Sequence, residues 1–279
     1  MKQLETVGLV EGYNAANHSN SRPLNPARKI AVETHRDGRY RHRANQSQTE
    51  AARAKGYRKG RGAADGPAGR FEVTEHVAFD DGWESGQARL EDLIQRPTTV
   101  SEDRAKSVLT FNESPDLGFD RSVNPYRGCE HGCTYCYARP SHAFMGLSAG
   151  LDFETKLFAK YDVARLLEDA LRRPGYQVAP IALGTNTDPY QPIERELKLT
   201  SSILAVLDDC NHPVTIVTKS AGILRDLDRL SRMARRGLVS VGVSVTTLDA
   251  ALSRLMEPRC SSPARRIDTI RHLADAGVP

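Results

Sequence analysis

The chain has 279 residues, 39% of them hydrophobic, and its 39 Lys and Arg against 35 Asp and Glu give a net charge of +4 at pH 7. No apolar run approaches the length of a membrane span and no apolar signal core follows Met1, so we expect no membrane partner. Three clustered cysteines plus the isolated Cys210 and Cys260 suit a reducing compartment better than a secreted disulfide scaffold, so we expect a cytoplasmic protein of one or two domains.

The first 70 residues differ in charge from the rest of the chain. They hold 14 Lys and Arg against 6 Asp and Glu, a net +8, which leaves −4 for residues 71–279. Their polar composition, without sustained periodicity, predicts a mostly disordered extension that could touch nucleic acid; a solvated extension without function is the alternative. Residues 71–118 are expected to form an irregular lead-in with one short helical pattern at 88–95.

From residue 119 onward, apolar runs and helical periodicities alternate. They predict strands at 119–124, 179–183, 214–218 and 238–245, and helices at 162–173, 194–209, 224–235 and 263–276. This order predicts that residues 119–279 form an α/β domain with a parallel sheet and right-handed crossovers. The last residues, Gly277-Val278-Pro279, resemble the start of a fifth strand, so we expect an incomplete chain or a partner that supplies the remainder.

The βα loops of this domain contain the residues that could bind a ligand or a metal. In parallel α/β folds, ligands bind at the carboxyl ends of the strands, where residues 184–191, 218–222 and 244–249 are expected to meet. The first such loop contains Cys129, Cys133 and Cys136 in the spacing C-x3-C-x2-C. We therefore expect these three cysteines to lie at the active face.

Three thiols this close together indicate a metal site, since a disulfide would join only two of them. Zinc would take a fourth ligand, for which His131, Cys210 or Cys260 are candidates. An iron–sulfur cluster prefers thiolates, and three of them leave one iron of a four-iron cluster open to a substrate or second cofactor. Ligand count favours the cluster.

Several motifs then resemble the radical S-adenosylmethionine (radical SAM) superfamily, and within it the branch of spore photoproduct lyase and its uncharacterised bacterial relatives. The cysteine spacing with Tyr135 before the last cysteine carries the first resemblance. The branch is indicated by these stretches: Asn124-Pro-Tyr-Arg-Gly-Cys-Glu-His-Gly-Cys, Leu183-Gly-Thr-Asn-Thr-Asp-Pro-Tyr-Gln-Pro-Ile-Glu, Val217-Thr-Lys-Ser, Ser244-Val-Thr-Thr-Leu-Asp and Glu257-Pro-Arg. The similarity covers about residues 105–279.

This resemblance implies a partial (β/α)6 TIM-like barrel, here truncated after the fourth β/α unit. It implies a [4Fe-4S] cluster on Cys129, Cys133 and Cys136 that binds S-adenosylmethionine (SAM) and cleaves it reductively. The resulting 5′-deoxyadenosyl radical would abstract hydrogen from an unknown substrate. A reductant such as flavodoxin or ferredoxin would supply the electron. The alternative function is a nucleic-acid-associated metal module without radical chemistry.

Residue roles for SAM follow from the resemblance and from loop position. Tyr135 would pack against the adenine, or be only an aromatic wedge. Asn186 and Asp188 would bind the methionyl amino group, with an Asx turn before Pro189 as the alternative. Lys219 would bind the methionyl carboxylate, or be only a solvated lysine at a strand end. Ser244 and Thr246 would bind the ribose hydroxyls, or be present only for their β-propensity.

One departure from the family concerns a cysteine. Spore photoproduct lyase carries a hydrogen-donating cysteine some forty residues beyond its cluster, and residues 172–180 contain none. Cys260, after a βα loop, is the candidate spare catalytic thiol, whereas Cys210 is expected in the core. Arg127 could bind an anionic substrate or tune the cluster. Glu257 and Arg259 are expected to form a structural pair.

Overall fold

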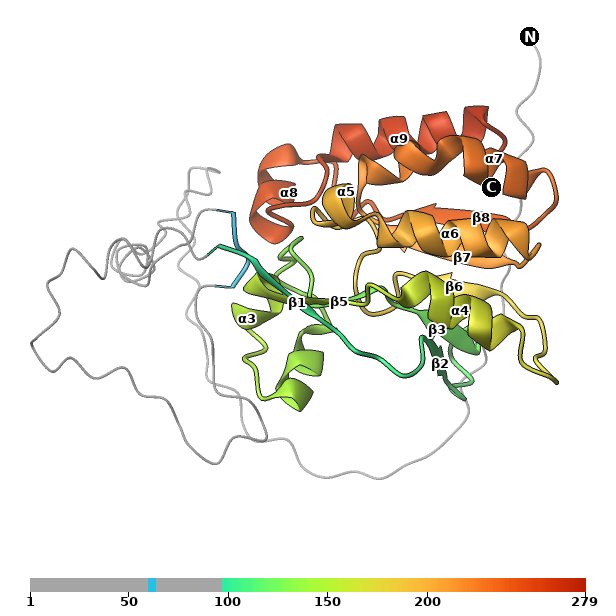
Figure 1. Cartoon of the computed structure of the whole chain (residues 1–279). Helices are drawn as coiled ribbons and strands as arrows, with labels where there is room; N and C mark the ends of the chain where they lie inside the picture. Colours follow the sequence, from blue (N-terminus) through green and yellow to red (C-terminus); the bar gives the residue numbers. More distant parts are fainter. Residues whose placement is uncertain (1–59, 64–96) are drawn as a thin grey trace, which may run out of the picture. The chain divides into compact units, whose positions relative to one another are not determined.

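The computed structural model describes residues 60–63 and 97–279, all within one compact unit, Asn45–Pro279 (Figure 1). The predictions for residues 1–59 and 64–96, including the helical pattern at 88–95, lie outside the described residues. The lead-in was wrongly expected to be irregular throughout, because residues 97–118 contain strands β1 (Thr99–Glu102) and β2 (Leu109–Phe111). Each pairs with a strand further along the chain, a partner that local sequence does not reveal.

The main sheet has five strands in the order β2-β3-β6-β7-β8. Four of them pair in parallel, namely β3 (Arg121–Val123), β6 (Ile181–Leu183), β7 (Val214–Thr218) and β8 (Val239–Val243), and β2 pairs antiparallel with β3. Helices α4 (Val163–Leu171), α6 (Leu199–Asp209) and α7 (Leu227–Ala234) connect successive parallel strands (Figure 1). The α/β order expected for residues 119–279 is confirmed.

Strand register separates an apolar face of this sheet from a polar one. Val123, Leu183 and Ile216 are in register and belong to the main hydrophobic cluster, together with helix residues such as Leu167 and Leu204. Side chains one position away point to the opposite face because successive residues alternate along a strand. That row contains only small or hydroxylated side chains: Thr110, Ser122, Ala182, Thr215 and Ser240. The helices therefore cover one face and leave the other polar.

Two predicted helices contain a break. The helix expected at 194–209 is split into α5 (Glu194–Leu197) and α6 by Lys198, whose φ is 53°. The carboxylate of Glu194 accepts the Thr200 N–H at 3.1 Å, so it occupies a donor at the start of α6 that a continuous helix would have used. Likewise the segment 224–235 begins as a 3₁₀ helix, η2 (Ala221–Asp226), before α7.

A small second sheet supports the cysteine loop. It has the order β1-β5-β4, with β4 (Tyr126–Arg127) leading directly into the cysteines and β5 (Lys156–Ala159) at its centre. The 3₁₀ helix η1 (Arg139–Met145) and helix α3 (Asp152–Thr155) lie between these strands in the chain, and α8 (Ala250–Met256) precedes α9 (Pro263–Asp275). The sequence missed β4, β5, η1, α3 and α8 because elements this short carry no usable periodicity.

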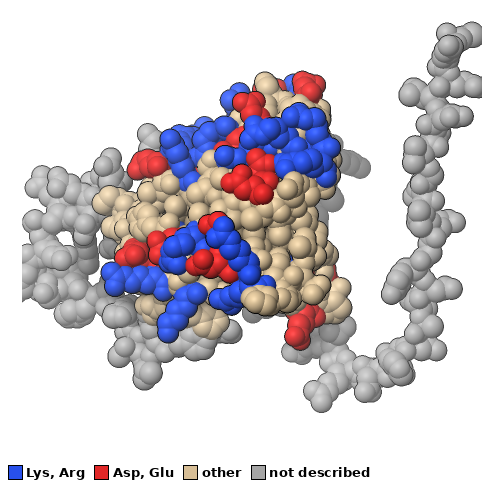
Figure 2. All heavy atoms as spheres, turned by 45° about the vertical axis from the view of Figure 1, so that its right-hand side comes forward, with Lys and Arg blue, Asp and Glu red and all other residues tan. Residues whose placement is uncertain are grey.

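The last residues of the chain lie beside β8. The Val241 N–H donates to the Pro279 carbonyl at 2.8 Å, so residues 277–279 run beside β8 as a starting strand would. On the face in Figure 2, basic side chains lie next to acidic ones. Ion pairs on the helices include those of Asp208 with Arg229, Arg232 and Arg236. Within residues 60–63 and 97–279, no helix is both long and apolar enough to cross a membrane.

Candidate active site around three cysteines

Two glycines shape the cysteine loop. Gly128 has φ +77°, and a Cβ there would lie 2.8 Å from the Phe153 carbonyl oxygen and 2.8 Å from a methyl group of Leu157. Gly132 has φ +66°, and its Cβ would lie 2.8 Å from Glu154 Oε2. Only glycine combines this backbone conformation with such close approach. The loop is therefore pressed against α3, and the Cys129 N–H donates to the Phe153 carbonyl at 2.9 Å.

Glu154 of α3 fixes the cysteine loop through hydrogen bonds. Its buried carboxylate accepts Gly62 N–H at 3.0 Å, Ala63 N–H at 2.9 Å and Arg139 Nη2 at 2.6 Å. Arg139 also donates to the Cys133 carbonyl at 2.8 Å. The sequence analysis missed both side chains. The sequence carried no specific signal for them, because Glu154 and Arg139 are two of many charged residues and the fold decides which are buried.

The three predicted metal-binding cysteines lie together. Cys129, Cys133 and Cys136 line one cavity of about 490 Å³ that opens to solvent. Its other wall consists of residues at the carboxyl ends of β6 and β7: Gly184, Asn186, Thr187, Asp188, Val217, Thr218 and Lys219. The parallel sheet thus brings the cysteine loop against two of the three βα loops that the sequence analysis expected to face it, those after β6 and β7.

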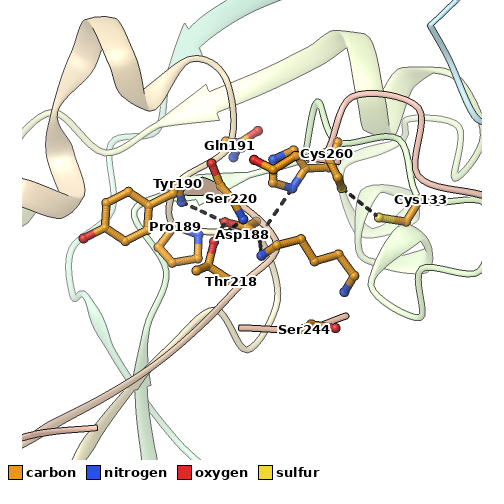
Figure 3. A network of polar contacts seen from close by, with 12 residues as sticks. Cys133, Asp188, Pro189, Tyr190, Gln191, Thr218, Ser220, Ser244 and Cys260 are labelled. Atoms are coloured by element: carbon orange, nitrogen blue, oxygen red, sulfur yellow. Dashed lines mark hydrogen bonds and ion pairs between the residues drawn. The ribbon is translucent and has the colours of Figure 1, made fainter. Parts of the chain in front are cut away.

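Asp188 is the centre of the contacts behind this cavity (Figure 3). Its Oδ1 accepts the Tyr190 N–H at 2.9 Å and the Thr218 hydroxyl at 2.7 Å. Its Oδ2 accepts the Lys219 N–H at 2.7 Å and lies 3.3 Å from His131 Nδ1. The Tyr190 contact is the Asx turn that the sequence offered as an alternative to SAM binding. Both carboxylate oxygens are therefore engaged by the protein itself.

His131 joins the cysteine loop to this carboxylate. Burial alone would lower the pKa of its imidazole, but the charges of Asp188 and Cys129 outweigh burial and raise that pKa well above its usual value. In turn the pKa of Asp188 stays low, because His131 and the hydrogen bonds from Lys219 and Thr218 offset its burial. The sequence analysis considered His131 only as a zinc ligand; its place between two cysteines was the signal for a supporting role.

Tyr135 and Lys219 contact each other beside the cysteine cavity. The Lys219 ammonium lies 5.8 Å from the centre of the Tyr135 ring, a cation–π contact. The Tyr135 hydroxyl is hydrogen-bonded to Glu257 and lies 3.0 Å from Thr246 Oγ1. Burial and Glu257 raise the pKa of Tyr135. Three of the predicted SAM-binding residues therefore form one connected group.

The other two predicted SAM residues are held mainly by their backbones. The Asn186 N–H donates to Asn124 Oδ1 at 3.1 Å, and the Asn186 side chain lines the cavity. The Ser244 N–H donates to the Thr218 carbonyl at 2.9 Å. Arg266 Nη1 donates to the Ser244 carbonyl at 3.0 Å, which fixes the loop after β8.

The cysteines outside the motif differ from each other in environment. Cys260 Sγ lies 3.8 Å from Cys133 Sγ. This contact lowers the pKa of Cys133 to about 7 and, with burial, raises the pKa of Cys260. Cys210 was predicted in the core but is exposed, because α6 ends there and turns its last residues to solvent.

The predicted pairing of Glu257 with Arg259 is wrong. Glu257 instead forms a fully buried ion pair with Arg266 of α9, and Arg259 Nη1 pairs with Glu130 Oε1 at 3.1 Å. Two residues apart in an irregular turn, the side chains of Glu257 and Arg259 point in different directions. Arg127 also lies away from the cysteine cavity, with its Nε 2.7 Å from Asp103 Oδ2.

Comparisons with known proteins relate this chain to one family. Residues 123–279 match the family model of the Radical SAM superfamily. An uncharacterised protein of Mycobacterium tuberculosis is 39% identical over 183 residues, covering 64% of this chain and 53% of the relative. One from Methanocaldococcus jannaschii is 29% identical over 175 residues, covering 63% of each. The chain thus spans about half the length of the mycobacterial relative.

Among solved structures, spore photoproduct lyase in complex with dinucleoside spore photoproduct has a TM-score of 0.45 and 16% identity. That comparison covers 73% of this chain and 54% of the other. A variant of the same lyase with bound AdoMet and dinucleoside spore photoproduct has a TM-score of 0.45 and 17% identity, covering 64% and 48%.

Proposed function

Since this chain belongs to the radical SAM superfamily, we propose that it is part of an enzyme that cleaves SAM reductively and abstracts a hydrogen atom from a substrate. The family implies SAM, an iron–sulfur cluster and a reductant. The observation that carries the proposal is that Cys129, Cys133 and Cys136 line a single cavity with Asp188 and Lys219. A cysteine triad kept only for packing would not need a polar wall from two separate βα loops.

The residues present fit such a cluster. Three thiols face one cavity, and the two glycines leave no Cβ that would force the loop away from α3. We propose that the three cysteines hold a [4Fe-4S] cluster through three of its irons. When bound, cluster and SAM together supply a 5′-deoxyadenosyl radical, and the protein contributes orientation and exclusion of water.

The chain's own side chains would then position SAM. Lys219 lines the cysteine cavity and suits the methionyl carboxylate, while Asn186 presents an amide for the methionyl amino group. Asp188 acts through its neighbours, since its oxygens already accept from the Lys219 backbone and Thr218. Tyr135, Ser244 and Thr246 suit the adenosine, and Tyr135 is anchored for that purpose by Glu257.

The finer assignments belong to the same proposal. We propose that the parallel strands form part of a (β/α)6 barrel whose polar face, containing Ser122 and Thr215, is the interior. The electron would come from a protein such as flavodoxin or ferredoxin. Cys260, next to Cys133, is proposed as the thiol that returns a hydrogen atom to a substrate radical. We do not propose the substrate of spore photoproduct lyase as the substrate of this chain.

The test is anaerobic reconstitution with iron and sulfide, followed by dithionite and SAM. We expect about four irons per chain and formation of 5′-deoxyadenosine, measured by mass spectrometry. Alanine variants of Cys129, Cys133 and Cys136 should each lose both, whereas Cys210→Ala, an exposed cysteine elsewhere, should keep both. Full cluster loading without any 5′-deoxyadenosine would overturn the proposed reaction.

A second candidate is a nucleic-acid-associated metal module, favoured by the +8 charge of residues 1–70. Residues 60–63 and 97–279 contain no group of three or more His, Cys, Asp or Glu side chains arranged around a single ion. One zinc ion therefore fits the loop less well than a larger cluster. Stoichiometric zinc without iron in anaerobically purified protein, with nucleic-acid binding that weakens steeply with salt, would favour the module instead.

A further inference from the structure

A second pocket lies beside the cysteine cavity, on the polar face of the sheet. Its volume is about 770 Å³ when the adjoining space open to solvent is included, and Asn186 lines both this pocket and the cysteine cavity. Asn124 lies between the two, since its Oδ1 holds the Asn186 N–H and its carbonyl accepts from Lys160. The Asn186 side-chain amide has no hydrogen-bond partner in the described part of the chain. A molecule in this pocket would thus reach the residues proposed to hold SAM.

The floor of the pocket carries unused hydroxyl groups. Thr110 of β2 lies directly opposite Ser122 of β3, so their side chains share the polar face. Both line the pocket, and neither hydroxyl has a hydrogen-bond partner among residues 60–63 and 97–279. Ser122 as a residue is only 7% exposed, but its hydroxyl is open to the pocket rather than enclosed by protein. Both hydroxyls are therefore free to hydrogen-bond a ligand in the pocket.

The wall of the pocket carries two cations for one carboxylate. Arg127 Nε lies 2.7 Å from Asp103 Oδ2, and Lys160 Nζ lies 3.3 Å from the same oxygen. The side chain of Lys160 is only 10% exposed, and its burial lowers its pKa. Lys160 has three donors, of which Asn124 and Asp103 take two. Both terminal nitrogens of Arg127 lack partners within the described residues. The pocket therefore keeps one uncompensated positive charge.

We propose that this pocket binds the phosphate ester of a small, hydroxylated substrate and presents the rest of that molecule toward Asn186. The donors come from separate elements, Arg127 on β4, Lys160 after β5 and the β2–β3 hydroxyl pair. Such a spread suits the several oxygens of a phosphate, whereas Arg127 alone would satisfy the two of a carboxylate. The role as substrate site rests on the proposed function, but phosphate binding does not.

The test is calorimetric titration of the anaerobically reconstituted full chain, without reductant, using ribose 5-phosphate, ribose and ribonate as probes. We expect ribose 5-phosphate to bind at least about tenfold more tightly than the other two, and Arg127→Gln to remove about tenfold of that affinity. Asp103 keeps Lys160 as its partner in this variant, so the fold should survive. The matched control is Arg104→Gln, an 85% exposed arginine on the neighbouring turn, and it should bind like wild type.

Equal binding of ribose 5-phosphate and ribose would overturn the proposal, as would equal losses in Arg127→Gln and Arg104→Gln. Ribonate binding as tight as that of the phosphate would overturn the choice of phosphate ester. Since no reductant is present, these outcomes are independent of 5′-deoxyadenosine formation. Failure of the radical reaction with retained phosphate binding would therefore count against the proposed function alone.

Discussion

Asp188 Oδ2 lies 3.3 Å from His131 Nδ1, and this contact ties the loop after β6 to the cysteine loop. In Asp188→Asn, His131 and the Lys219 N–H would meet either an amide NH₂ group or an uncharged oxygen in place of the carboxylate. We expect a loss of about 2–4 kcal/mol in the free energy of unfolding and reduced iron content after reconstitution. Urea unfolding of the cluster-free protein and iron analysis measure the two effects.

The control for that variant is Asp162→Asn, which removes an exposed pair with Arg165 and should cost less than about 1 kcal/mol. If Asp188→Asn and Asp162→Asn unfold at the same urea concentration and load iron equally, Asp188 does not hold the loops together.

Gly128→Ala should damage the cysteine loop by steric contact. The added Cβ would lie 2.8 Å from the Phe153 carbonyl oxygen and would also require a left-handed backbone. Gly146→Ala is a matched control, since Gly146 has φ +67° with open space around its Cβ position. We expect about 1 kcal/mol for the control from strain alone and a clearly larger loss for Gly128→Ala, with less iron bound. Equal losses would show that the loop tolerates the contact.

The 3.8 Å separation of Cys133 and Cys260 predicts a specific cross-link. In cluster-free protein, a mild thiol oxidant such as diamide should take one hydrogen from each thiol and join Cys133 to Cys260. Peptide mapping by mass spectrometry should find this disulfide in wild type and not in Cys260→Ser. Preferential pairing of Cys133 with Cys136 or with exposed Cys210 would contradict the observed arrangement.

The buried pair of Glu257 and Arg266 should contribute strongly to stability. Glu257→Gln leaves the Arg266 guanidinium buried without its counter-charge, and we expect a loss of about 3–5 kcal/mol in the free energy of unfolding. Asp268→Asn, which removes an exposed pair with Arg271 on the same helix, should cost under about 1 kcal/mol. Since Glu257 also anchors Tyr135, weaker SAM binding should accompany the change. A neutral Glu257→Gln variant would refute this role.

The lowered pKa of His142 should cost the protein stability in mild acid. It is fully buried, and burial lowers its pKa although Nε2 hydrogen-bonds to the Lys156 carbonyl. At His142 the unfolded chain then binds a proton below about pH 6.5 that the folded chain does not, so the contribution of His142 to stability is complete above that pH and falls below it. The slope is at most about 1.4 kcal/mol per pH unit for one histidine.

Urea unfolding at pH 7.5 and 5.5 tests this. His142→Gln should show a smaller decrease than wild type, whereas His272→Gln, on the exposed side of α9, should decrease like wild type. Identical decreases in all three proteins would mean that His142 does not titrate on unfolding.

Long-range contacts explain what the sequence analysis got wrong. Helix 194–209 has a continuous apolar pattern, yet it breaks at Lys198 because Glu194 is drawn to Arg225 and to the Tyr126 hydroxyl. Strands β1 and β2 exist only through pairing with β5 and β3. Glu257 pairs with Arg266 rather than Arg259 because α9 folds back over its turn. None of these partners is local in the sequence.

The sequence by itself determined the α/β order, the cysteine motif and the loops that surround it, because periodicity and spacing are local properties and parallel strands bring their carboxyl ends to one edge. Only the tertiary structure decided that Asp188 serves the loops as an acceptor of four contacts, that Cys260 touches Cys133, and that Arg127 belongs to a separate polar pocket. These facts depend on which side chains meet across β3, β6 and β7, and burial then fixes their charges and partners.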